Sequence, residues 1–90
     1  MKLTVFKIYR SLDSVFVDGG WEIKRKIEVP STSIFIPEKF NEDVVKGAVL
    51  ATLKLPHGVD FWVDIMSDEA VVIRASDSNA PILELLANKN

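Results

Sequence analysis

The stretch Val59-Asp60-Phe61-Trp62-Val63-Asp64-Ile65-Met66 decides the fold class, because apolar and polar side chains alternate along much of it. Alternation with a period of two is typical of a β-strand that buries one face. The buried face of this predicted strand carries Val59, Phe61, Val63 and Ile65. The opposite face carries Asp60, Trp62, Asp64 and Met66. A tryptophan between two carboxylates on the solvent side leaves a large apolar surface in water, unless a second layer or a partner covers it.

Turn residues on both sides of this strand predict antiparallel neighbours. Pro56-His57-Gly58 predicts a turn that joins a strand at Ala48–Leu55 to the strand at Val59–Met66, because proline presets one corner and glycine accepts a left-handed residue. Ser67-Asp68-Glu69 predicts a second turn, which leads into a strand at Ala70–Arg74. The three strands together predict an antiparallel meander.

The N-terminal half shows a clear hairpin signal. Asp18-Gly19-Gly20 contains residues that tolerate positive φ, and it links a strand at Ser14–Asp18 to one at Trp21–Val29. An earlier strand at Lys2–Tyr9 has apolar residues on both faces, which favours a central or bulged strand. Arg25 is the one charged residue on the apolar face of its strand, so we expect it to reach the rim, to mark a β-bulge, or to pair with a carboxylate of the C-terminal half.

Helical patterns are scarce. The better candidate is Ala80–Ala87, which has Ser78 or Asn79 as N-cap, Pro81 in its first turn and a wide leucine-rich face. Pro37–Lys46 is a weaker candidate, because the valines near its end are equally suited to a strand. The sequence therefore predicts an α+β protein: an antiparallel β-sheet or small partly open barrel of about five to seven short strands, with a C-terminal helix packed on it.

Length and composition narrow the class of protein. Ninety residues, 48% of them hydrophobic, predict one folded domain over residues 1–90. There is no cysteine, which excludes disulfides and thiolate chemistry. The first residues lack the pattern of a signal peptide and no apolar run has the length of a membrane span, so we expect a cytoplasmic location with no membrane contact.

Residues suited to catalysis are few. The single histidine, His57, lies in a predicted turn, and the sequence has no phosphate-loop, dinucleotide, zinc or nucleophile-elbow motif. Asp60 and Asp64 are about 13 Å apart along one strand, which is too far for a paired acid and base. We therefore expect no enzymatic activity, no cofactor and no metal. An enzyme whose carboxylates meet only after folding stays open as an alternative.

One basic cluster raises the question of nucleic acid. Lys24, Arg25 and Lys26 follow Trp21 closely, so a small oligonucleotide-binding β-barrel that uses Trp21, Lys24 and Lys26 is the alternative function. The formal net charge of −2 argues against it, and alternation sends Arg25 to the opposite face from the two lysines. We do not expect nucleic-acid binding.

By elimination, the sequence predicts a non-enzymatic protein-binding module that acts by surface contact with a larger protein. Small accessory, immunity-like and inhibitor-type proteins of the kind that mobile elements encode have this size and composition. The predicted site consists of Asp60, Trp62, Asp64 and Met66, and its carboxylates favour a partner with a basic surface. Formation of a homodimer, through a strand edge or the leucine-rich segment, and sugar stacking on Trp62 are further alternatives.

Overall fold

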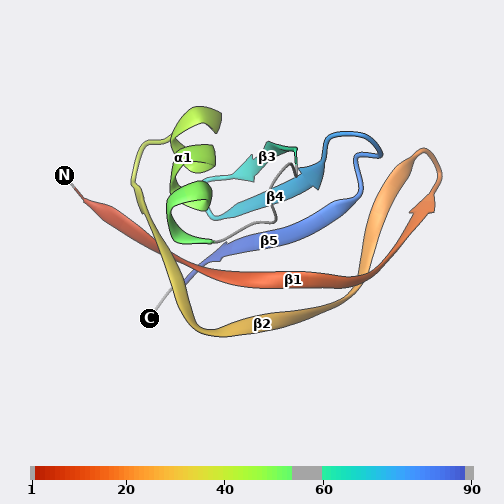
Figure 1. Ribbon diagram of the computed structural model, residues 1–90, viewed down its shortest axis with the longest axis horizontal. Helices are drawn as coiled ribbons and strands as arrows, with labels where there is room; N and C mark the ends of the chain where they lie inside the picture. Colours follow the sequence, from red (N-terminus) through yellow and green to blue (C-terminus); the bar gives the residue numbers. More distant parts are fainter. Residues whose placement is uncertain (1, 54–59, 89–90) are drawn as a thin grey trace.

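Five antiparallel strands and one helix make up the computed structural model, which describes residues 2–53 and 60–88 (Figure 1). The elements are β1 (Leu3–Val17), β2 (Gly20–Pro37), α1 (Glu42–Thr52), β3 (Phe61–Ser67), β4 (Ala70–Ala75) and β5 (Pro81–Ala87). The strand order is β2-β1-β5-β4-β3, so the sheet is open, with β2 and β3 at its edges. The predicted α+β class and antiparallel sheet are confirmed.

The predicted C-terminal helix at Ala80–Ala87 is wrong. This segment forms β5, which pairs with β1 on one side and with β4 on the other. Its burial alternates: Leu83 and Leu85 are buried, while Ile82 and Leu86 are partly exposed. A strand in the middle of a sheet can carry apolar residues at successive positions, and a short run of this kind resembles the wide apolar face of a helix.

The helix lies between β2 and β3 in the chain; it confirms the weaker candidate Pro37–Lys46 over residues 42–46 and continues to Thr52. Asn41 is the N-cap, where its side-chain oxygen accepts a hydrogen bond from the Val44 amide at 3.0 Å. Val45 and Val49 are four residues apart and both are buried against the sheet. The predicted strand at Ala48–Leu55 is therefore wrong over its first five residues, and the meander is β3-β4-β5 instead.

The two predicted turns that lie within the described residues are confirmed, whereas the turn between β4 and β5 was predicted as the start of a helix. Asp18 and Gly19 have positive φ (52° and 79°) and close the hairpin between Val17 and Gly20, as a two-residue turn of this chemistry requires. The turn after β3 brings Ser67 opposite Ala70. The predicted turn at residues 56–58 lies outside the described residues.

The first two strands form one long, bulged hairpin. The strands predicted at Lys2–Tyr9 and Ser14–Asp18 are parts of β1, whose pairing with β2 shifts register three times. Two of these shifts flank the pair formed by Asp13 and Arg25, so the interpretation of Arg25 as a bulge marker is confirmed, and its side chain is exposed. β5 pairs with β1 only from Phe6 to Arg10. The outer part of the β1–β2 hairpin therefore extends beyond the end of β5. We call this outer part, residues 11–26, the arm.

The core lies between the sheet and α1. Its buried members come from all five strands and the helix: Phe6, Ile8, Ile34, Ile36, Val45, Val49, Phe61, Val63, Val71, Ile73, Leu83 and Leu85. Figure 1 shows α1 on one side of the sheet. We call the other side, which carries Trp62 and Arg74, the open face. No helix in the described residues is long and apolar enough to cross a membrane.

Candidate protein-binding surface

Strand β3 presents two faces of opposite character, as its sequence predicts. Phe61 and Val63 are buried towards α1. On the open face, 43% of Trp62 is exposed. Met66 is 59% exposed and lies where the β3–β4 register shifts, between Ile65 and Ser67. Because β3 is an edge strand, the side chains on its open face have only the neighbouring strand β4 beside them among the residues that the structure describes. A C-terminal helix is not the second layer over Trp62, because the segment predicted to form that helix is β5.

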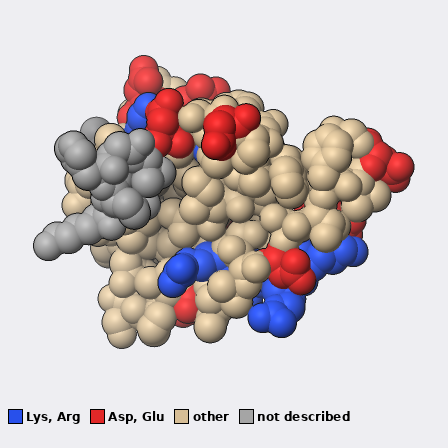
Figure 2. Space-filling view, turned by 45° about the vertical axis from the view of Figure 1, so that its right-hand side comes forward, with Lys and Arg blue, Asp and Glu red and all other residues tan. Residues whose placement is uncertain are grey.

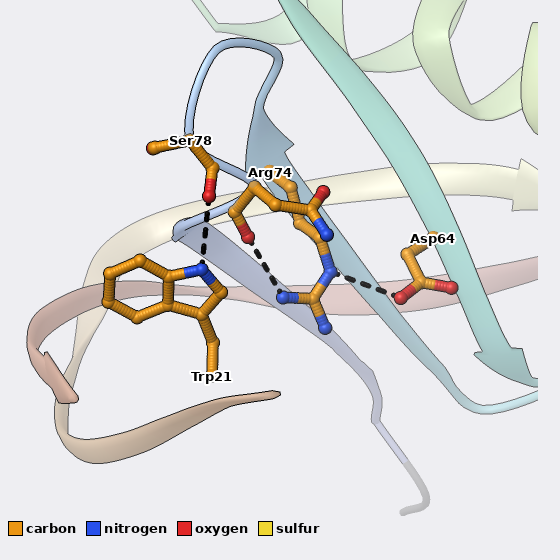
Figure 3. Close-up of polar contacts among 5 residues, drawn as sticks. Trp21, Asp64, Arg74 and Ser78 are labelled. Carbon is orange, nitrogen blue, oxygen red and sulfur yellow. Dashed lines mark hydrogen bonds and ion pairs between the residues drawn. The ribbon is translucent and has the colours of Figure 1, made fainter. Parts of the chain in front are cut away.

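The two aspartates of the predicted site have different roles. Asp64 accepts a hydrogen bond from Arg74 Nε, with 3.0 Å between Nε and Oδ2 (Figure 3). Asp60 comes directly before β3, is exposed, and accepts a hydrogen bond from the Ser76 amide through its backbone carbonyl. The Asp60 carboxylate therefore faces solvent, while the Asp64 carboxylate is already paired.

Arg74 is a site residue that sequence reasoning missed. It lies opposite Trp62 in the β3–β4 register, and its side chain is only 15% exposed. Besides Asp64 it contacts the turn between β4 and β5, where Nη1 donates to the Asn79 carbonyl at 3.2 Å. Arg74 thus joins the edge strand, its own strand and the following turn beside Trp62. The sequence carries only a weak signal for this role of Arg74. Alternation places Arg74 on the polar face of β4, but it does not show which carboxylate the guanidinium meets.

The residues of the alternative nucleic-acid surface all have partners within the protein. Trp21 packs edge to face against Phe16, and its Nε1 donates to the Ser78 carbonyl at 3.1 Å (Figure 3). Lys24 pairs with Glu22 at 3.2 Å, and Lys26 pairs with Glu84 at 2.6 Å. Trp21 therefore fastens the arm to the turn between β4 and β5, and both lysines are neutralised by carboxylates rather than left for phosphates.

A second feature missed by the sequence is a groove beside β3. Two adjoining hollows of about 450 and 440 Å³ share Phe40 and Ile65 as their apolar lining. Polar residues complete the walls: Glu38, Lys39, Asn41, Glu42, Asp43 and Asp68. We call these hollows together the edge groove. The sequence does carry a signal for the position of Phe40. Phe40 comes directly before the N-cap Asn41 and five residues before Val45, which is the spacing of a hydrophobic staple.

The charges of the molecule are unevenly distributed. In Figure 2 the carboxylates gather mainly in the upper part of the view, at the level of α1 in Figure 1, while most lysines and arginines lie lower, at the level of β1 and β2. Around β3 and the start of α1, residues 38–46 and 60–69 carry seven carboxylates and two lysines. The exposed edge of the sheet at β3 is therefore acidic.

Apolar side chains are also exposed elsewhere. The arm exposes Leu12, Phe16 and Val17. Phe35 of β2 is exposed as well, and it lies opposite Val5 of β1. Unlike Trp62, these residues lie away from the acidic strand edge. No group of three or more histidine, aspartate or glutamate side chains in the described residues has the arrangement of a metal site.

Comparison of the chain with family models, curated proteins and solved structures finds no match. The function is therefore inferred from the geometry of the surface itself.

Proposed function

We propose that the protein is a non-enzymatic protein-binding module that contacts a larger partner through the β3 edge of the open face. The observation that carries this proposal is the exposure of Trp62 on a strand whose other face is buried. Trp62, Met66 and Asp60 make the contact surface. Asp64 acts through Arg74, which it holds in place on the strand beside the tryptophan.

The free energy of burying Trp62 favours its use as a contact residue. Burying the exposed 43% of Trp62 contributes about 2 kcal/mol, since a buried tryptophan removes roughly 150–250 Å² from water. A side chain held on a strand and backed by an ion pair loses little conformational freedom when it binds. Tryptophan and methionine are enriched in the centres of protein interfaces, and an exposed aspartate at the margin favours a partner with a basic surface.

We propose that the protein occupies a surface of its partner, as an accessory, immunity-like or inhibitor-type protein does. The small size of the chain and the location of its exposed tryptophan at a sheet edge support this class.

The test is affinity capture from nuclease-treated lysate of the native host, with mass spectrometry of the retained proteins. Tagged parent protein is compared with Trp62→Ala. We expect one or a few proteins that the parent retains and the variant loses, because removal of a central tryptophan anchor typically costs 2 kcal/mol or more, about a 30-fold loss of affinity.

Leu50→Ala is the matched control, since Leu50 is an equally exposed apolar residue on α1. Circular dichroism establishes that all three proteins are folded. Equal retention of every captured protein by the parent and Trp62→Ala would show that Trp62 is not the contact residue, and capture of nucleic acid alone when the nuclease is omitted would reject the proposed class.

A further inference from the structure

Within the described residues, β3 has one edge without a strand partner. It pairs with β4 on one side, and no backbone hydrogen bond in the described residues reaches residues 61–67 from the other side. An unpaired edge is a template for another strand, and proteins usually blunt such edges with lysine, proline, a β-bulge or a covering element. Residues 61–67 contain neither lysine nor proline, and Phe61–Ile65 pair with β4 in regular register before the shift between Ile65 and Ser67. This edge is therefore chemically suited to accept a strand.

Contact surfaces flank this edge on both sides of the sheet. Trp62 is exposed on the open face, and Met66 is exposed at the register shift that follows Ile65. On the helix side the edge groove begins at Ile65, with Phe40 as its other apolar wall. Successive side chains of a strand point to opposite faces. An added strand would therefore place alternate side chains over Trp62 and Met66, and the others towards the edge groove.

Charge decides what kind of strand fits. Glu38, Glu42, Asp43 and Asp68 line the edge groove and are exposed, and none of them forms an ion pair within the described part of the chain. Lys39 is the one basic residue in the lining. Lysine or arginine side chains of a ligand can lay their apolar stems on Phe40 and Ile65 and place their charges at this rim.

We propose that β3 binds an extended segment of the partner protein as a sixth strand, and that this segment alternates basic and apolar residues. The basic side chains face the edge groove, and the apolar ones pack over Trp62 and Met66. This inference rests on the proposed function and adds to it the mode of binding and the chemistry of the partner. Main-chain hydrogen bonds supply affinity, and the two rows of side chains supply specificity.

The probe is a blocked seven-residue peptide of alternating valine and lysine, which matches the seven residues of β3. A peptide of alternating valine and glutamate is the charge control. Binding is followed by NMR, through the amide shifts of the isotopically labelled protein and the exchange rates of its amide protons. We expect the lysine peptide to shift residues 61–67 and to slow exchange at the β3 amides that do not donate to β4, and the glutamate peptide to leave them unchanged.

Two double variants test the acidic rim. Glu42→Lys with Asp68→Lys reverses two charges of the edge groove, whereas Asp13→Lys with Asp77→Lys reverses two exposed charges elsewhere. We expect the first to weaken peptide binding about tenfold or more, and the second to change it less than about threefold.

Any of three results overturns the inference: shifts confined to the arm, equal affinity for both peptides, or equal binding by both double variants. A concentration-dependent dimer whose interface protects the same β3 amides also overturns it, because the edge would then be occupied by a second copy. Loss of a captured partner on Trp62→Ala can still occur in each case, so failure of this inference is distinguishable from failure of the proposed function.

Discussion

At the scale of single residues, Arg74 connects the parts of the molecule that surround Trp62. Its guanidinium donates through Nε to Asp64 on β3 and through Nη1 to the carbonyl of Asn79 in the turn after β4. Asn79 has a φ of 67°, in the left-handed region that only a few residue types adopt readily. Arginine donates to these acceptors from two nitrogen atoms held in one rigid plane, whereas lysine offers a single ammonium nitrogen on a flexible stem.

Replacement of Arg74 by alanine is expected to lower the free energy of unfolding by about 2 kcal/mol, because Asp64 and Asn79 lose a largely buried charged donor. Arg74→Lys should recover less than half of this loss. Urea denaturation followed by circular dichroism measures both. Lys24→Ala is the control, since its pair with Glu22 is exposed and contributes about 0.5 kcal/mol or less. Equal losses for Arg74→Ala and Lys24→Ala would show that the Arg74 contacts add no stability beyond a surface pair.

At the scale of elements, β5 shows that its neighbours in the fold decide whether an apolar run forms a strand or a helix. Its neighbours β1 and β4 cover both of its edges, and α1 and the core cover one face. Leu85 is fully buried on that face, whereas Leu86 lies on the open face opposite Lys7 of β1 and is partly exposed. In a helix the same two leucines would both belong to the apolar face.

Substitution of these neighbouring leucines therefore distinguishes the strand from a helix. Leu85→Ala should cost about 3 kcal/mol of unfolding free energy, because it opens a cavity in the core. Leu86→Ala should cost about 1 kcal/mol, since less area is buried there. Both values come from urea denaturation at equal protein concentration. Losses that agree within error would contradict the position of β5 in the sheet.

At the scale of the whole molecule, the sheet with its helix is distinct from the arm. Every buried core residue lies in residues 6–8, 34–49 or 61–85, and none lies in the arm. The arm is fastened to the rest by the hydrogen bond from Trp21 to Ser78 and by the ion pair of Lys26 with Glu84. Segments with few buried apolar contacts open locally at low free-energy cost.

A shortened hairpin should therefore fold. Ser11 and Lys26 face each other in the β1–β2 register. Replacing residues 12–25 with Asn-Gly links these two residues through a two-residue turn that favours hairpins. We expect cooperative unfolding with a free energy within about 2 kcal/mol of the parent, because the core stays whole. NMR amide shifts should change near Ser78 and stay unchanged in β3. An unfolded or aggregated product would show that the arm is part of the folding unit.

Local chemistry was enough to predict the features of this protein that depend on nearby residues. Alternation in β3 predicted a buried face with Phe61 and Val63 and placed Trp62 on the opposite face, because the side-chain period of a strand is a property of its own backbone. The turns after Val17 and Ser67 were predicted from residues that tolerate their dihedral angles. The bulge at Arg25 was one of three interpretations that its misplaced charge allowed.

Only the tertiary structure decided which segments meet. The apolar run of β5 is compatible with a helix or a central strand, and its place between β1 and β4 settles the matter because pairing on both edges satisfies its backbone. The pairing of Asp64 with Arg74 depends on register, and the edge groove depends on Phe40 and Ile65 coming from separate elements. The sequence by itself determined the local periods, two of the turns and the strand face on which Trp62 lies. Long-range pairing decided the rest, including the exposure of Trp62, since contacts between distant residues are not encoded in any single local pattern.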